Sequence, residues 1–241
     1  MIISHEKQFI ILAPWKTASS TIRARLGAYC ASPYSEFYHF NPYLKRVVHQ
    51  HMIYADFAAL PESRLGYFTA AFIRNPYDRV YSGFRQLQKD LQNQPFAEFP
   101  DPDVRRLVMK QLSENFACLC QAGFSFESWL ELIDDHLILD VGRNTSFPLH
   151  PSHYWTHYDG EQAVDFIGRV ETFERDFDRL CERLGIDIES RVNENVDADE
   201  AEIAGDERGY RYVDRMSSAA RRRINELFRD DFELFGYERV G

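Results

Sequence analysis

The sequence is poor in the features that mark secreted, metal-binding and membrane proteins. Its 241 residues include only four cysteines, at irregular spacings, which is too few for a disulfide framework or a zinc site. We expect free, buried thiols at Cys30, Cys118, Cys120 and Cys181. The first apolar run ends at Pro14, is too short to cross a bilayer, and is not followed by a small-residue cleavage site. These absences predict a soluble, cytoplasmic protein with no membrane anchor and no export signal.

Positive charge is also scarce. There are 28 Lys and Arg against 38 Asp and Glu, a net charge of −10, which argues against a nucleic-acid partner. Hydrophobic residues make up 44%, so the chain can bury a core, and its length fits a single domain over residues 1–241. Residues 1–90 hold 11 Lys and Arg against 6 Asp and Glu. This local surplus of positive charge indicates an anion site. An uneven scatter of surface charge is the alternative explanation.

Short apolar runs alternate with segments of helical spacing. Buried strands are expected over residues 9–13, 67–73 and 164–168, each leading to a helix, over 21–26, 77–91 and 173–184 respectively. Further helices are expected over 104–121, 126–134 and 213–235, and loops over 93–103 and 193–209. The alternation predicts an α/β fold with a central, mostly parallel sheet flanked by helices.

The segment Pro14–Thr21 joins the first expected strand to its helix. It contains one lysine, one alanine and four hydroxyl residues: Lys16, Thr17, Ala18, Ser19, Ser20 and Thr21. The first turn of a helix presents backbone N–H groups and the positive end of the helix dipole, and therefore binds phosphate or sulfate. An ordinary Ser/Thr N-cap is the simpler interpretation, but four hydroxyls and a lysine exceed what a cap needs. Both glycines of the ATP-binding P-loop are missing, and Ala18 is the nearest substitute.

A second motif, RNPYDRVYS over residues 74–82, follows the second expected strand. Arg74 offers a fork of donors for a phosphate, at the strand end where open α/β sheets bind ligands. Ser82, in the following helix, can add a hydroxyl to the same anion. The intervening Tyr77 and Tyr81 have the spacing of packing residues, and Asp78 fits a helix cap.

The third motif is His49-Gln50-His51. On a strand, residues two apart point to the same face, so the two rings are expected side by side. Such a pair also fits half of a metal site, but the sequence offers no third ligand nearby, and no metal is predicted.

Taken in order, the patterns PxKTxSST, HxHxxYxDF and RNPYDRxxS resemble the sulfotransferase family of the Golgi carbohydrate enzymes and their bacterial relatives. The middle pattern is most similar to the uronyl and heparan sulfate 2-O-sulfotransferase branch. Residues 167–177 and 231–237 also look like this family, so the resemblance covers nearly the whole chain. Two positions depart from it, because Trp15 stands where the family usually has proline and Ala18 where it usually has glycine.

The resemblance implies a P-loop-like α/β fold and a sulfuryl donor, 3′-phosphoadenosine-5′-phosphosulfate (PAPS). It assigns Lys16 to Thr21 to the 5′-phosphosulfate and Arg74 with Ser82 to the 3′-phosphate. His51 would be the general base on an acceptor hydroxyl, with His49 beside it and no metal required.

The acceptor is expected to be a saccharide or a small molecule, and the excess of acidic residues after position 90 favours a neutral or cationic one. An aromatic, His-rich segment over residues 150–158 is a candidate lining of the acceptor pocket, with a sugar stacked on Trp155. Ordinary packing of these side chains is an equally good interpretation. Two alternatives remain. One is a P-loop kinase of a small metabolite, with Leu137–Asp140 as a magnesium-binding strand, and the other is a non-catalytic nucleotide-binding relative.

Overall fold

The computed structural model describes residues 1–241 apart from 35, 37, 94–101, 134–148 and 188–204. The chain divides into two compact units, each made of two stretches. The first unit comprises Met1–Arg74 with Ser152–Ala204, and the second comprises Asn75–Pro151 with Gly205–Gly241. The single domain expected from the length stays a prediction.

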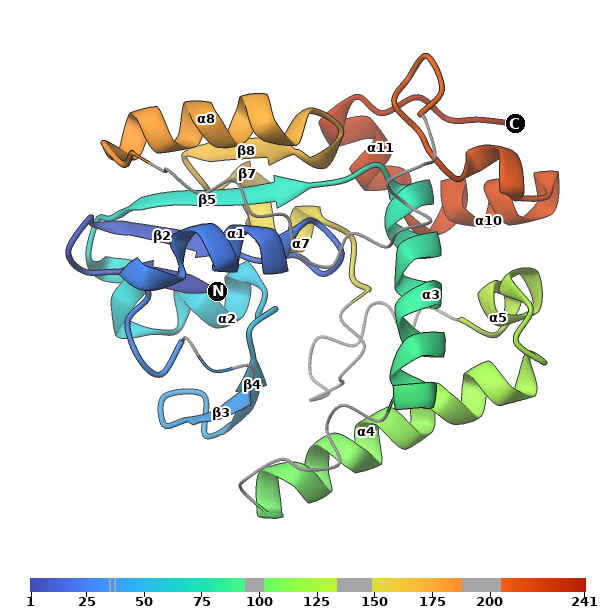
Figure 1. Cartoon of the computed structure of the whole chain (residues 1–241), viewed down its shortest axis with the longest axis horizontal. Coiled ribbons are helices and arrows are strands. Elements are labelled where there is room, and N and C mark those ends of the chain that lie inside the picture. The colour runs from blue at the N-terminus through green and yellow to red at the C-terminus, as the bar shows by residue number, and fades with distance from the viewer. Residues whose placement is uncertain (35, 37, 94–101, 134–148, 188–204) are drawn as a thin grey trace. The chain divides into compact units, whose positions relative to one another are not determined.

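A four-stranded sheet with the order β1-β2-β5-β8 forms the centre of the first unit (Figure 1). Its strands are β1 (Ile2–Ser4), β2 (Phe9–Leu12), β5 (Phe68–Ile73) and β8 (Phe166–Arg169). β2 pairs with β5 and β5 with β8 in parallel, while β1 pairs with β2 antiparallel. The expected, mostly parallel sheet is confirmed. β1 was not predicted, because three residues are too few to show a periodicity.

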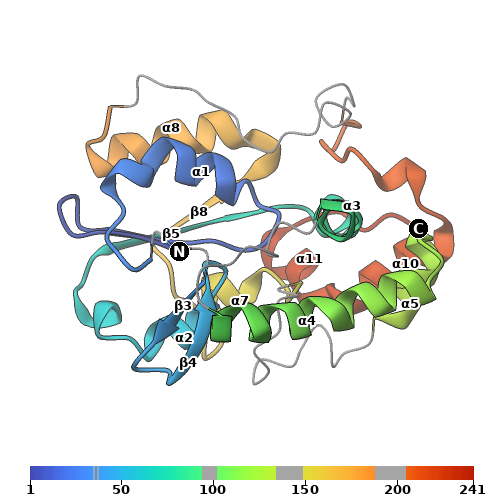
Figure 2. The same cartoon turned by 60° about the horizontal axis from the view of Figure 1, so that its bottom comes forward.

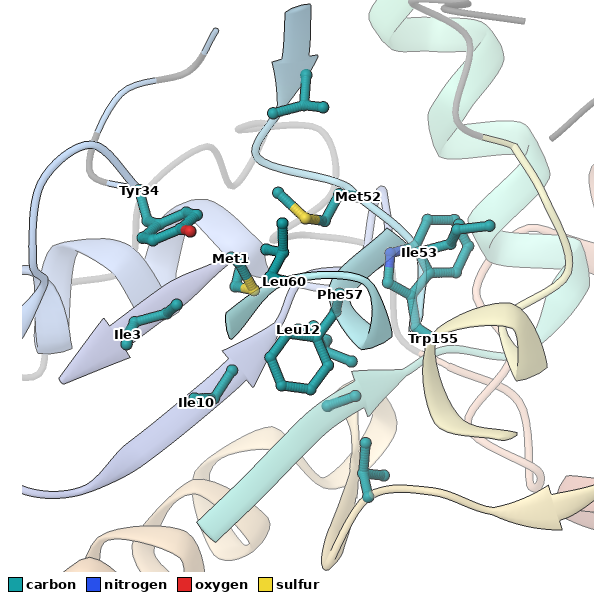
Figure 3. Packing of buried hydrophobic residues seen from close by; sticks show 13 residues of the cluster. Met1, Ile3, Ile10, Leu12, Tyr34, Met52, Ile53, Phe57, Leu60 and Trp155 are labelled. Carbon is teal, nitrogen blue, oxygen red and sulfur yellow. The ribbon is translucent and has the colours of Figure 1, made fainter. Parts of the chain in front are cut away.

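Both faces of this sheet are covered, which explains why β2 is continuously apolar. Phe9 and Ile11 of β2 point to one face and pack with α1 (Ser19–Leu26) and α8 (Phe173–Leu184). Ile10 and Leu12 point to the other face, where α2 (Tyr54–Ala58) and α7 (His153–Thr156) supply Phe57 and Trp155 (Figure 3). Figure 2 shows α1 and α8 on one side of the sheet and α2 on the other.

Short elements complete the first unit. The hairpin β3 (Tyr38–Asn41) and β4 (Arg46–His49) leads into α2, and a second hairpin joins β6 (His157–Tyr158) to β7 (Glu161–Gln162). Three 3₁₀ turns lie at Gly27–Tyr29, Pro61–Arg64 and Val170–Thr172.

The described part of the second unit is helical. Its helices are α3 (Pro76–Asn93), α4 (Pro102–Gln121), α5 (Phe126–Leu132), α10 (Ser218–Leu227) and α11 (Arg229–Phe235), with a 3₁₀ turn at Val213–Arg215. The single helix expected over 213–235 is therefore wrong. Phe228 leaves the helical conformation, with φ −115° and ψ 27°, and its buried ring lies 5.6 Å below the Arg79 guanidinium. The sequence has no proline or glycine at this break, and the break coincides with the packing of Phe228 against Arg79.

The cysteine expectation holds in part. All four cysteines are free, but Cys181 is buried whereas Cys120 is exposed. Most of the expected loops at 93–103 and 193–209 lie outside the described residues, as does the candidate strand Leu137–Asp140.

An ion pair ties α1 to α8 over the sheet. The buried Arg25 guanidinium donates to both carboxylate oxygens of Glu174, at 2.8 and 2.7 Å. Its plane lies within 5.3 Å of the Phe173 ring and 5.0 Å of the Phe177 ring. Bidentate pairing with aromatic contact is the geometry that arginine provides and lysine does not. The last turn of α1 is thereby attached to the first turn of α8, although Arg25 and Glu174 are 149 residues apart.

Gly168 of β8 generates a test of this packing. A Cβ at Gly168 would lie 2.4 Å from the Phe72 ring, whereas a Cβ at Gly27 would meet nothing within 4 Å. Because Phe72 is buried in the sheet, we expect Gly168→Ala to lower the free energy of unfolding by about 1–3 kcal/mol. Urea unfolding should show Gly27→Ala unchanged or stabilised, since Gly27 has helical φ and ψ. Equal stabilities of the two variants would contradict the packing of β8.

Candidate functional site

The loop between β2 and α1 has an unusual backbone. Lys16 and Ala18 adopt left-handed conformations, with φ of 63° and 62°, which side-chain-bearing residues avoid. Left-handed residues in a turn before a helix are typical of anion-binding nests, in which successive backbone N–H groups point toward a common centre. The positive φ of Ala18 is what a glycine would adopt without strain, which gives a physical reason for the glycine expected at this position.

The rest of the loop is consistent with an anion site. Thr17 is buried and its hydroxyl donates to the Pro14 carbonyl at 2.8 Å, so this side chain stabilises the loop itself. Lys16, Ser19 and Ser20 are half-buried, and Thr21 is buried. The first turn of α1 carries no acidic side chain, so nothing there competes with a bound anion for the helix dipole.

His49 and His51 lie close together, although not as expected. β4 ends at His49, and His51 lies in the turn before α2, so the two are not on one strand. The turn brings their rings to 5.4 Å, and the His51 backbone N–H donates to His49 Nδ1 at 2.9 Å. The expected proximity is correct, and a turn rather than strand alternation produces it.

His51 is attached to the start of the loop between β2 and α1. Its Nδ1 lies 2.6 Å from the carbonyl oxygen of Ala13, the residue between β2 and the loop. Its own carbonyl accepts from Trp155 Nε1 at 3.2 Å. Trp155 is fully buried in the core (Figure 3), so of its two interpretations ordinary packing is correct and sugar stacking is not. Its indole N–H fixes the backbone of His51.

The surroundings of His51 favour the neutral imidazole. Burial holds its pKa well below the ordinary value of 6.5, and the neighbouring His49 lowers the pKa further. A neutral histidine has one nitrogen free to accept a proton, which is the state a general base requires at neutral pH.

Arg74 and Ser82 belong to different units. Arg74 is buried directly after β5, at the end of the first stretch of the first unit, and Ser82 is buried on α3 of the second unit. Their joint binding of one phosphate therefore stays a prediction.

The residues between Arg74 and Ser82 have structural roles. Asn75 Oδ1 accepts from the Asp78 backbone N–H at 2.9 Å, so Asn75 rather than Asp78 caps α3. Asp78 itself accepts from the backbone N–H groups of Arg211 and Tyr212 at 2.9–3.0 Å. Tyr81 stacks on the Tyr212 ring at 4.7 Å, as a packing residue does. Within RNPYDRVYS, the functional expectation thus rests on its two ends.

Two further findings concern the described part of the chain. No group of three or more His, Cys, Asp or Glu side chains there is arranged to hold a metal ion. None of the helices within these ranges is long and apolar enough to cross a bilayer.

Comparison with known proteins defines the family. The model of the sulfotransferase family matches residues 1–238, and the chain therefore belongs to the sulfotransferase family. It is 26% identical over 177 residues to carbohydrate sulfotransferase 10 of Gallus gallus, covering 71% of this chain and 47% of that protein. The chain thus spans about half the length of this relative. No solved structure matches.

Ala18 provides a test of the loop geometry. Replacing it with glycine should raise the free energy of unfolding by about 1 kcal/mol, because the left-handed strain of a Cβ disappears. Ala24→Gly is the matched control, since Ala24 is exposed within α1 and glycine there should lower stability by about 1 kcal/mol. Opposite signs in urea unfolding would support the geometry. If Ala18→Gly destabilised as much as Ala24→Gly, residue 18 would not be left-handed.

Proposed function

We propose that the protein transfers a sulfuryl group from PAPS to an acceptor hydroxyl without a metal ion, with His51 as the general base. The observation that carries the proposal is the hydrogen bond between His51 Nδ1 and the Ala13 carbonyl. It holds a neutral imidazole next to a loop suited to an anion, which is what transfer from an anionic donor to a hydroxyl requires. Membership in the sulfotransferase family supports the same reaction.

The chain offers suitable groups for both anionic ends of the donor. Lys16 and the backbone N–H groups at the start of α1 would bind the 5′-phosphosulfate, with the hydroxyls of Ser19, Ser20 and Thr21 as further donors. Arg74 would bind the 3′-phosphate, and Ser82 would contribute a hydroxyl. When bound, PAPS supplies an activated sulfuryl group with a phosphate as its leaving group.

The chemical roles follow from the positions of the donors and of the base. His51 Nε2 takes the proton of the acceptor hydroxyl as the new S–O bond forms and the bond to the leaving phosphate breaks. Lys16 and the loop N–H groups then meet negative charge that develops on the leaving oxygen. Because this positive charge is in place before the reaction, little reorganisation is needed. His49 accepts the His51 backbone N–H and thereby supports the base.

The name of the Gallus gallus relative favours a saccharide as the acceptor. Residues 91–241 contain 17 Lys and Arg against 32 Asp and Glu, which disfavours a polyanionic one. A neutral or cationic saccharide is therefore our proposed acceptor class.

Nucleotide binding tests the donor site. Calorimetric titration in EDTA should show binding of 3′,5′-ADP, the desulfated product, and none of ATP. Arg74→Ala should weaken the binding of 3′,5′-ADP about ten- to a hundredfold, which corresponds to the loss of one charge-assisted hydrogen bond. The control is Arg64→Ala, which removes an exposed arginine of the same unit and should change nothing. Binding of ATP with Mg²⁺ and none of 3′,5′-ADP would instead support the kinase alternative.

Turnover tests the base. With ³⁵S-labelled PAPS and a panel of neutral and amino saccharides, His51→Ala should lower transfer by about 10²–10⁴-fold, the usual loss on removing a general base. His49→Ala should lower it less, since His49 acts through a backbone N–H. Both variants should bind 3′,5′-ADP as the unmodified protein does. Full turnover in His51→Ala would exclude His51 as the base.

A further inference from the structure

Gln50 lies between the proposed base and an arginine of α1. Its Oε1 accepts from Arg23 Nε at 3.0 Å, and its Nε2 lies 3.3 Å from His51 Nε2. Gln50 and His51 are both buried, with exposed fractions of 7% and 5%. The amide therefore contacts the ring nitrogen that would take the acceptor proton.

The donor and acceptor chemistry of the side chains determines how the Gln50 amide is oriented between Arg23 and His51. Arginine has only N–H donors, so the Gln50 atom that faces Arg23 must be the carbonyl oxygen. The Gln50 NH₂ group then faces His51 and can only donate, so His51 Nε2 must accept.

The opposite side of the ring leads to the same result independently. The Ala13 carbonyl can only accept, so His51 Nδ1 must carry the proton. Both sides of the imidazole thus require one neutral tautomer, with the proton on Nδ1 and the lone pair on Nε2. Free histidine prefers the other tautomer, so the surroundings of His51 determine this one.

We propose that Gln50, oriented by Arg23, is a positioning residue that keeps the His51 lone pair on Nε2 until an acceptor hydroxyl replaces the Gln50 amide there. This inference rests on the proposed function, because it assumes that His51 Nε2 is the base. In the reaction, the acceptor O–H bond breaks and its proton goes to Nε2, the oxygen bonds to sulfur, and the S–O electron pair leaves with the phosphate oxygen. The Gln50 amide cannot accept the new Nε2–H without turning its oxygen away from Arg23.

The charged groups around His51 act in the same direction. His49 from β4 and Arg23 from α1 disfavour a positive charge on the ring, as does the Met1 amino group when it is protonated, whereas the Ala13 carbonyl favours it. A glutamate at position 50 would reverse this balance. It could accept from Arg23 with one oxygen and from a protonated His51 Nε2 with the other, which would stabilise the imidazolium.

The test uses ¹⁵N NMR of the histidine rings and needs neither donor nor acceptor. The protein has eight histidines, and the signals lost in His51→Gln identify residue 51. The unmodified protein should show His51 neutral at pH 6.5 with its proton on Nδ1. In Gln50→Glu the pKa of His51 should rise by about 1–3 units, the usual effect of an adjacent opposite charge. The control is Gln162→Glu, which adds the same charge on β7 in the same unit and should leave His51 unchanged.

Two results would overturn the inference: a neutral His51 with its proton on Nε2 in the unmodified protein, or a His51 titration that Gln50→Glu leaves unchanged. The first measurement involves no variant, so it does not depend on how Gln50→Glu folds. The proposed function is tested separately by 3′,5′-ADP binding and ³⁵S transfer. The predicted tautomer without either activity would refute the proposed function and leave the geometry of Gln50 intact.

Discussion

The hydrogen bond between His51 Nδ1 and the Ala13 carbonyl joins two segments that are 38 residues apart, and the proposed site depends on it. Ala13 follows β2, which is paired on both sides by β1 and β5, so its carbonyl is fixed by the most buried part of the sheet. The imidazole itself lies in a turn between a short hairpin and a five-residue helix. The sheet thus positions the proposed base through the Ala13 carbonyl oxygen. A change in the core under β2 would move the proposed base and the proposed anion-binding loop together.

The loop itself is strained, and its surroundings determine its shape. Two side-chain-bearing residues with positive φ disfavour this conformation by about 1–2 kcal/mol each. The conformation is retained because β2 precedes it within the sheet, the Thr17 hydroxyl bonds back to Pro14, and Arg25 fixes α1 to Glu174. Strain of this kind is typical of functional loops, where a fixed array of N–H groups is more useful than a relaxed one. The same contacts that fold the first unit therefore preorganise the groups that we propose to bind the anion.

Sequence patterns predicted the sheet and its flanking helices well, because these elements depend on local apolar periodicity. They failed where packing between distant residues decides the structure. Phe228 interrupts the last helix where its ring packs under Arg79. Trp155 is buried in the hydrophobic core, where its indole donates to the His51 carbonyl. The candidate residues Lys16, His49 and His51 could be found from residue type and spacing. Gln50 could not, since its importance follows from the orientation of three side chains that no pattern in the sequence specifies.

The physical basis of the motifs also shows which of them carry evidence for activity. Residues 75–82 of RNPYDRVYS resemble the family strongly, and so do residues 231–237, but these two segments both belong to the second unit and contact each other there. The Tyr77 ring lies 5.1 Å from that of Phe232, and burial lowers the pKa of Arg79 to about 10 while Asp231 favours its charged form. The resemblance of both segments to the family therefore reflects one packed interface, and it is one piece of evidence for activity rather than two. Lys16, His51 and Arg74 lie outside this interface, in the other unit, and independent evidence for sulfuryl transfer has to come from them.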